Sequence, residues 1–318
     1  GATPFYIACQ NGHIEIVKLL LNDNRRVDIN KTRDGGFTPF YIACQNGHIK
    51  IVKLLLNAPR VDLNKAMNHG AIPFLIACGK GHIEIVKLLL NDKRIDINKA
   101  NNDGVTPFYI ACQNGHIEIV KLLLNDKRVD MNKATNKDRE TPFFIACYYG
   151  HIEIIKLLLN DRRIDINKAT NNCWTPFNNA CYYGHIEVME LLLNDEKIDI
   201  NKPINNGWTP FHRACQDGHI VIVKYMLACG REIVLNKEND DGKTCLDWTR
   251  EREKLGWGRK REWEKIVELI ESFERNPNET RLQLRIQLGL TGNSFFIYFI
   301  LFYFILFIYF ILFIYLFI

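Results

Sequence analysis

The sequence has little excess of charge of either sign. Lysine and arginine total 41 and aspartate and glutamate total 36 in 318 residues, and the surplus is spread along the chain rather than gathered into one basic arm. Nucleic acid is therefore not an expected partner. Hydrophobic residues make up 47% of the chain, which is enough for a large buried core.

The sequence also lacks a recognisable catalytic constellation. No Ser-His-Asp set, Cys-His set or carboxylate pair stands out from the rest of the chain. The segment Asp241-Gly242-Lys243-Thr244 imitates the end of a phosphate-binding loop, but Lys237 stands where the upstream glycine should be. We therefore expect no enzymatic activity, no catalytic residues and no cofactor.

What the sequence does contain is a repeated unit. Its first residues, Thr-Pro-Phe or a variant, return every 34 or 35 residues, at Thr3, Thr38, Ile72, Thr106, Thr141, Thr175, Thr209 and Thr244. Thr106 suits a helix N-cap, and Pro107 suits the first helical position. The apolar residues that follow predict a short helix, and Asn114-Gly115 predicts a reversal of the chain.

A second helix is expected to start near His116. There Ile117, Val120, Leu123 and Leu124 recur at helical spacing, which indicates an amphipathic helix. One such unit cannot bury its own apolar face, so neighbouring units must stack side by side. The expected fold class is an all-α solenoid of stacked helix pairs joined by short β-hairpin turns.

Four segments of one unit carry a resemblance to a known family. They are Asp103–Phe108, Ala111-Cys112, Gly115–Leu124 and Val129–Asn132. They resemble the ankyrin repeat, and the resemblance recurs through seven units and more loosely an eighth. It implies a protein-protein interaction scaffold or adaptor that binds a partner on its concave surface. An alternative is the targeting or regulatory part of a larger enzyme, a kinase or ubiquitin ligase, whose catalytic domain is missing from this chain.

Two features depart from the ankyrin pattern. The histidine that usually follows Thr-Pro-Leu is present only as His212. The turn glycine is replaced by Arg139 and by Cys173 in two units. If the turn keeps its shape there, each of these residues adopts a left-handed conformation at a cost of about 1–2 kcal/mol.

The domain organisation follows from the repeats and from the ends of the chain. Residues 1–275 are expected to form the ankyrin repeat domain, with a truncated first repeat that suggests a fragment of a longer array and a degenerate last repeat that serves as a cap. Residues 276–294 are assigned to a linker, although residues 281–288 alternate like a strand, because they have no obvious sheet to join.

Cysteine and histidine recur once in each unit. Equivalent helices of neighbouring repeats lie about 8–10 Å apart, whereas a disulfide needs Cα atoms within about 7 Å, so we expect free thiols and a reducing compartment. No metal site is expected, because ligands must converge on one ion. The residues concerned are Cys9, Cys44, Cys78, Cys112, Cys147, Cys181 and Cys215, and His13, His48, His82, His116, His151, His185 and His219.

The residues that recognise a partner are expected at the positions where the repeats differ. By the resemblance, the residue before Thr-Pro and the residues after the helix cysteine line the concave face, and aromatic residues gather at these positions in neighbouring units. The alternative is that these rings pack between repeats. The predicted partner-binding residues are Tyr148, Tyr149, Trp174, Tyr182, Tyr183 and Trp208.

The last 24 residues, 295–318, are only Phe, Ile, Leu and Tyr. A helix of that length spans about 36 Å, enough to cross a hydrocarbon layer of about 30 Å. Arg275, Arg281 and Arg285 precede the tail, so the positive-inside rule would keep the repeats in the cytosol, as in a tail-anchored protein. The alternative is translated AT-rich non-coding DNA. The expected localisation is cytoplasmic, with a membrane as a further partner if residues 295–318 are an anchor.

Overall fold

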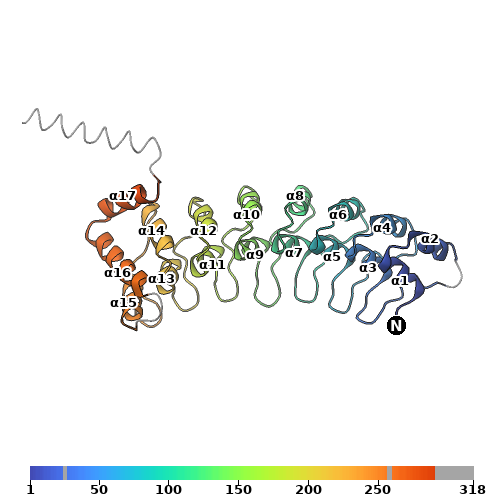
Figure 1. Ribbon diagram of the computed structural model, residues 1–318, viewed down its shortest axis with the longest axis horizontal. Coiled ribbons are helices and arrows are strands. Elements are labelled where there is room, and N and C mark those ends of the chain that lie inside the picture. The colour runs from blue at the N-terminus through green and yellow to red at the C-terminus, as the bar shows by residue number, and fades with distance from the viewer. Residues whose placement is uncertain (24–26, 256–259, 291–318) are drawn as a thin grey trace, which may run out of the picture. The chain divides into compact units, whose positions relative to one another are not determined.

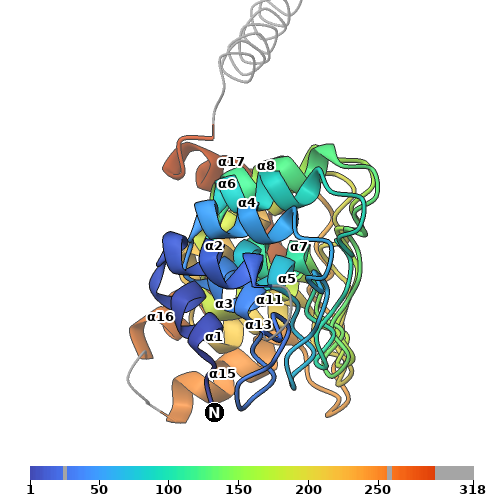
Figure 2. The ribbon, with the colours of Figure 1, turned by 90° about the vertical axis from the view of Figure 1, so that its right-hand side faces the viewer.

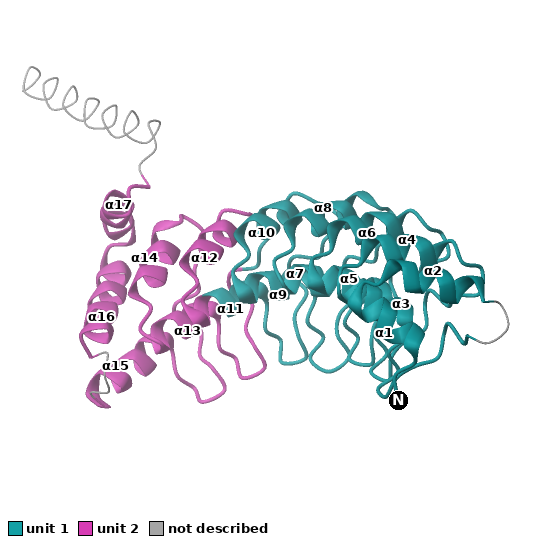
Figure 3. Ribbon diagram, turned by 45° about the vertical axis from the view of Figure 1, so that its right-hand side comes forward, with its two compact units in different colours: residues 1–180, 197–199 teal, residues 181–196, 200–318 magenta. Residues whose placement is uncertain are grey.

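The computed structural model describes residues 1–23, 27–255 and 260–290, and Figure 1 labels its helices. The chain forms two compact units, one of residues 1–180 and 197–199 and the other of residues 181–196 and 200 onward (Figure 3). No residue in the described ranges belongs to a strand. The predicted all-α fold class is confirmed, and the predicted hairpins are tight turns without strands.

The first unit is a stack of helix pairs. Its first helices are α1 (Pro4–Asn11), α3 (Pro39–Gln45), α5 (Pro73–Lys80), α7 (Pro107–Gln113) and α9 (Pro142–Tyr149). Its second helices are α2 (Ile14–Asn22), α4 (Ile49–Leu56), α6 (Ile83–Leu90), α8 (Ile117–Asn125) and α10 (Ile152–Leu159). Each first helix packs on the next first helix, and each second helix on the next second helix, which confirms the predicted stacking. Figure 2 shows the loops of this unit projecting to one side of the helix rows.

The second unit starts within α11 (Pro176–Tyr183) and ends in three helices that differ from the pairs. It contains α12 (Ile186–Leu193), α13 (Pro210–Gln216), α14 (Ile220–Ala228), α15 (Cys245–Leu255), α16 (Lys260–Arg275) and α17 (Pro277–Gln287). Helix α15 packs on α13 and α16, while α14 packs on α12, α16 and α17. The degenerate last repeat therefore covers the end of this unit, as a cap does.

Helix α17 occupies a segment that the sequence pattern assigned to a linker. It begins at Pro277 after Asn276, whose side chain accepts a hydrogen bond from the Glu279 N–H at 3.3 Å. Thr280 and Leu284 lie one helical turn apart and are both buried. The strand-like alternation of residues 281–288 is misleading, because a helix that buries only one narrow stripe can carry such a pattern. The linker assignment is therefore wrong for residues 277–287.

The described ranges contain no helix that is both long and apolar enough to cross a membrane. The predicted apolar tail, residues 295–318, lies outside these ranges.

The first helices begin where the Thr-Pro signal predicts. The Thr106 hydroxyl accepts a hydrogen bond from the Tyr109 N–H at 3.1 Å, and Thr38 caps α3 in the same way at 3.0 Å. In both helices proline follows at the first position. Ile72 replaces threonine before α5 and makes no side-chain cap. The helices therefore start for local reasons that the sequence contains.

Two non-glycine residues adopt a left-handed backbone in the turns between pairs. Arg139 has a φ of 58° and Cys173 a φ of 60°, while Gly104 has a φ of 84° at the equivalent position. In the Gly104 turn the Gly104 N–H donates to the Asn101 carbonyl at 3.0 Å, and in the Cys173 turn the Cys173 N–H donates to the Thr170 carbonyl at the same distance. The Cys173 turn thus keeps its shape without the glycine, whereas the Arg139 turn is one residue longer, because its closing bond runs from the Thr135 N–H to the Glu140 carbonyl.

The cysteine of each first helix is buried, and burial raises its thiol pKa, to about 12 for Cys9. Cys173 and Cys229 are only half-buried. We expect a thiol reagent to label Cys173 and Cys229 in the folded chain and to leave the buried thiols of the described residues unlabelled, because a protonated, enclosed thiol is a poor nucleophile. Peptide mapping by mass spectrometry before and after denaturation measures this. Rapid labelling of Cys112 in the folded chain would contradict it.

Candidate functional site

The recurring histidines bind backbone carbonyls. In the first unit, Nε2 of His48, His82, His116 and His151 donates to a carbonyl oxygen of the preceding pair at 2.8–2.9 Å. In the second unit, His219 Nε2 donates to the Tyr182 carbonyl at 2.9 Å. These side chains therefore hold successive pairs in register. Among the described residues, no three His, Cys, Asp or Glu side chains are grouped as a metal site requires.

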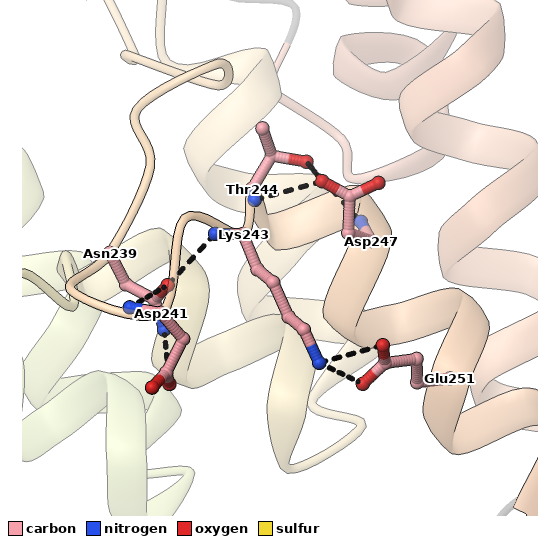
Figure 4. A network of polar contacts seen from close by, with 6 residues as sticks. All are labelled: Asn239, Asp241, Lys243, Thr244, Asp247 and Glu251. Atoms are coloured by element: carbon pink, nitrogen blue, oxygen red, sulfur yellow. Dashed lines mark hydrogen bonds and ion pairs between the residues drawn. The ribbon is translucent and has the colours of Figure 1, made fainter.

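The segment that imitates a phosphate-binding loop is a turn followed by a helix cap (Figure 4). Lys243 Nζ lies 2.7 Å from both carboxylate oxygens of Glu251. The Thr244 hydroxyl donates to the Asp247 carboxylate at 2.7 Å, and the Thr244 N–H donates to the same oxygen at 3.0 Å. Asp247 lies in the first turn of α15, and its pKa is held below its usual value by these two bonds from Thr244. The Lys243 charge is thus paired within the cap.

The six predicted partner-binding residues differ strongly in exposure. Tyr149 is 52% exposed and Tyr183 is 48% exposed, whereas Trp208 is only 4% exposed. Tyr148, Trp174 and Tyr182 are half-buried. Tyr148, Tyr149 and Trp174 belong to the first unit, and Tyr182, Tyr183 and Trp208 to the second. One contiguous patch of all six stays a prediction.

In the first unit, neighbouring rings fix the exposed ring of Tyr149. The Tyr149 ring stacks on His151, with centroids 6.1 Å apart and an interplanar angle of 23°. Tyr148 meets it edge-on at 5.1 Å. Because His151 is itself bound to the Gln113 carbonyl at 2.8 Å, the Tyr149 ring rests on a fixed support. Such an aromatic ring presents contact area at a small cost in entropy.

Acidic side chains lie close to Tyr109, a neighbour of Tyr149. The Tyr109 hydroxyl donates to Glu140 Oε2 at 2.8 Å. Burial first, and then the bond to Glu140, raise the pKa of Tyr109, and the charges of Glu140 and Asp138 and the nearby Tyr149 raise it further. Glu140 is therefore tied to the tyrosine that lies next to Tyr149.

The second unit repeats the same ring geometry. Tyr183 stacks on His185 with centroids 6.0 Å apart and an interplanar angle of 23°, and Tyr182 meets Tyr183 edge-on at 4.9 Å. Here, however, the Arg213 guanidinium lies 5.4 Å from the centre of the Tyr182 ring. Burial lowers the pKa of Arg213, while the nearby Asp217 and Tyr182 raise it. The two tyrosine pairs thus share one ring geometry, and in the second unit a guanidinium lies against Tyr182.

Trp208 is part of the packing and not of the surface. Its ring lies 5.1 Å from the Trp248 ring and 5.9 Å from His212, with the Arg213 guanidinium 4.5 Å from its centre. Helix α15, which carries Trp248, covers it. The prediction that Trp208 contacts a partner is therefore corrected, because the cap buries this side chain. The packing alternative holds for Trp208.

Trp174 follows the left-handed Cys173 in its turn. Its N–H donates to the Thr170 hydroxyl at 3.2 Å, and its carbonyl accepts from the Thr170 N–H at 3.0 Å. The turn backbone thus fixes the position of this half-buried tryptophan.

Comparison with protein families identifies the repeats. The family described as "Ankyrin repeats (3 copies)" matches residues 1–67, 59–134 and 127–204, and the family described as "Ankyrin repeat" matches residues 206–240. The chain belongs to the ankyrin repeat family. Comparison with curated proteins gives no match. Ankyrin repeats are in general non-catalytic modules for protein-protein interaction, so the chain is an interaction scaffold in this broad sense.

The ankyrin histidine after Thr-Pro is fully enclosed at its one occurrence. The Thr209 hydroxyl and His212 Nδ1 lie 2.7 Å apart, and the His212 N–H donates to the same hydroxyl at 3.3 Å. His212 is buried, and burial lowers its pKa to about 4. In the repeat before it, Asn178 occupies the equivalent position, and its N–H donates to Thr175 in the same way.

The ankyrin pattern of the sequence did not predict the contacts of Glu140 and Arg213 with Tyr109 and Tyr182. Each of these charged side chains meets an aromatic residue of the preceding repeat, Tyr109 or Tyr182, 31 residues earlier in the chain. A charged residue 31 positions after a tyrosine of the preceding repeat is the signal that could have found them.

Proposed function

We propose that these ankyrin repeats hold a partner protein through Tyr149 and Tyr183. The observation that carries the proposal is that each unit presents one exposed tyrosine ring with the same local contacts, stacked on a histidine and met edge-on by a second tyrosine. Large exposed aromatic rings with a polar tip are enriched among residues that dominate binding energy. Rigid support keeps the entropy lost on binding small.

The two tyrosines select different chemistry in the partner. Tyr149 lies near Tyr109, whose hydroxyl binds Glu140, and this carboxylate favours a basic side chain on the partner, whose cation the tyrosine face can take up. Beside Tyr183, the Arg213 charge disfavours such a side chain. We therefore propose that the partner surface that meets Tyr149 carries a lysine or arginine, and that the partner surface that meets Tyr183 carries an apolar or acidic residue.

The test exploits the residues that other repeats carry at the same position. Asn46 and Asn114 occupy, in two other repeats, the position of Tyr149 and Tyr183. The double variant Tyr149→Asn, Tyr183→Asn therefore introduces a residue that the fold accepts at this position. We expect the double variant to keep the unfolding curve of the wild type and to bind the partner at least about 30-fold more weakly, as the loss of a hot spot of about 2 kcal/mol requires. Affinity is measured with the partner that the wild-type chain captures from cell extract.

The matched control is Lys80→Ala, at the same position of another repeat, where the side chain is exposed. This variant should bind the partner like the wild type. If a correctly folded double variant binds as tightly as Lys80→Ala, the tyrosines do not hold the partner and the proposal is wrong.

A further inference from the structure

The loops of the first unit line an open cavity of about 530 Å³ whose lining does not include Tyr149. It lies between the turns that precede α9 and α11. The residues that supply its charges and its hydroxyl group are Asp130, Lys133, Thr135, Arg139 and Lys168.

The cavity is positively charged, and its cations are available. Lys133 and Arg139 are exposed, and among the described residues they take part in no hydrogen bond or ion pair. Lys168 Nζ donates to a backbone carbonyl, that of Asn132, at 3.1 Å and not to a carboxylate. The lining contains one acidic side chain, Asp130, which accepts the Asn132 N–H at 3.1 Å. Three cations and one carboxylate leave the cavity with two positive charges.

Arg139 is held in this cavity at a conformational cost. Its φ is 58°, in the left-handed region that Gly70 and Gly104 occupy in the turns of the two preceding repeats. A non-glycine residue in this region costs about 1–2 kcal/mol relative to its preferred conformations. Strained residues cluster at binding sites, where the position of the side chain offsets the cost. Here the strained residue, Arg139, lines a cavity that Lys133 and Lys168 also line.

The walls of the cavity are fixed before any ligand binds. The Asn136 side-chain amide donates to the Asn102 carbonyl at 2.9 Å, and the Asn132 amide donates to the Arg163 carbonyl at 2.6 Å. The Asn136 N–H also donates to the Asp103 carbonyl at 2.8 Å. These bonds tie the loops to their neighbours, so that the cations project from a rigid frame.

We propose that this cavity binds the dianion of a phosphate monoester. A phosphate group carries about −1.5 to −2 charges at pH 7, which matches the two positive charges of the cavity, whereas a single carboxylate leaves one of them uncompensated. The Arg139 guanidinium can donate two parallel hydrogen bonds to phosphate oxygens, and the two ammonium groups and the Thr135 hydroxyl offer further donors. The phosphate belongs either to a phosphorylated protein side chain or to a free phosphate.

The experiment titrates the full chain with inorganic phosphate and, separately, with peptides that carry one phosphoserine between randomised flanks, using calorimetry at pH 7.5 and pH 5. We expect saturable binding that weakens at pH 5, because the phosphate then loses its second charge. Arg139→Gly restores the turn glycine and should bind about tenfold more weakly while unfolding no more easily than the wild type. Lys133→Gln and Lys168→Gln should also weaken binding.

The matched control is Lys99→Gln, because Lys99 is the equivalent of Lys133 in a repeat whose turn carries Gly104. It should bind like the wild type. Tighter binding of the phosphopeptides than of inorganic phosphate assigns the cavity to a phosphorylated protein, and equal binding assigns it to free phosphate. Absence of saturable binding, or unchanged binding by Arg139→Gly, overturns the proposal. The tyrosine proposal is decided separately, by the partner binding of the Tyr149 and Tyr183 variants.

Discussion

Replacing Gly115 with alanine is expected to lower the free energy of unfolding by about 3 kcal/mol. Two costs add up. Gly115 has a φ of 74°, where a Cβ atom costs about 1–2 kcal/mol, and the new Cβ would lie 2.8 Å from Cε1 of His151. The ring cannot swing away without losing its bond to the Gln113 carbonyl at 2.8 Å. Urea unfolding followed by circular dichroism measures the change.

The control for this prediction is the same substitution in a variant that lacks the His151 ring. In a His151→Ala background, Gly115→Ala should cost only the backbone strain, because the collision is gone. If the glycine substitution costs the same with and without the His151 ring, the close approach between the two repeats is not what requires glycine there.

Lowering the pH from 6.5 to 4 is expected to remove about 3 kcal/mol of stability through His212 alone. Burial lowers the pKa of His212 to about 4, and the positive charges of Lys237 and Arg213 add to this effect, while the backbone carbonyl groups of Lys237 and Lys243, as hydrogen-bond acceptors, oppose it. Unfolding returns the pKa to about 6.5. A depressed histidine pKa means that the unfolded chain takes up the proton first. The contribution of the neutral ring is therefore complete above pH 6.5 and is lost as the pH falls through 4.

The variant His212→Asn isolates this effect, because Asn178 shows that the fold accepts asparagine at the equivalent position. Carboxylates also titrate in this range, so the informative quantity is the difference in slope of unfolding free energy against pH between the two chains. The variant should show the shallower slope between pH 6.5 and 4. Parallel slopes for both chains would contradict a buried neutral His212.

Local signals made most of the fold predictable. Thr106 and Pro107 fix the start of a helix through one hydrogen bond and one restricted dihedral angle, and both belong to adjacent positions in the sequence. Helix α17 was missed although Asn276 and Pro277 supply the same kind of start signal. The segment was assigned to a linker because its alternating residues had no sheet to join, and the burial of Leu284 depends on helices that the local sequence does not show.

The candidate site was predictable only in part, because exposure depends on residues that are distant in the sequence. The two residues of each Tyr-Tyr pair look alike in the sequence, yet Tyr183 is exposed while Arg213 lies against Tyr182. The sequence predicted that Trp208 is a surface residue, but Trp248, 40 residues later in the chain, packs against it. A repeat pattern predicts which positions vary, but the neighbouring repeat decides which of the variable side chains reaches solvent.

Site-specific photo-crosslinking tests the central claim most directly. A photoreactive amino acid takes the place of Tyr149, of Tyr183 or, as a control, of Glu153, which lies exposed on α10 and pairs with Lys156 at 2.7 Å. The account predicts that irradiation joins the partner to the chain from positions 149 and 183 and not from position 153. Crosslinks from position 153, with none from 149 and 183, would show that the partner binds the second helices and would contradict the account.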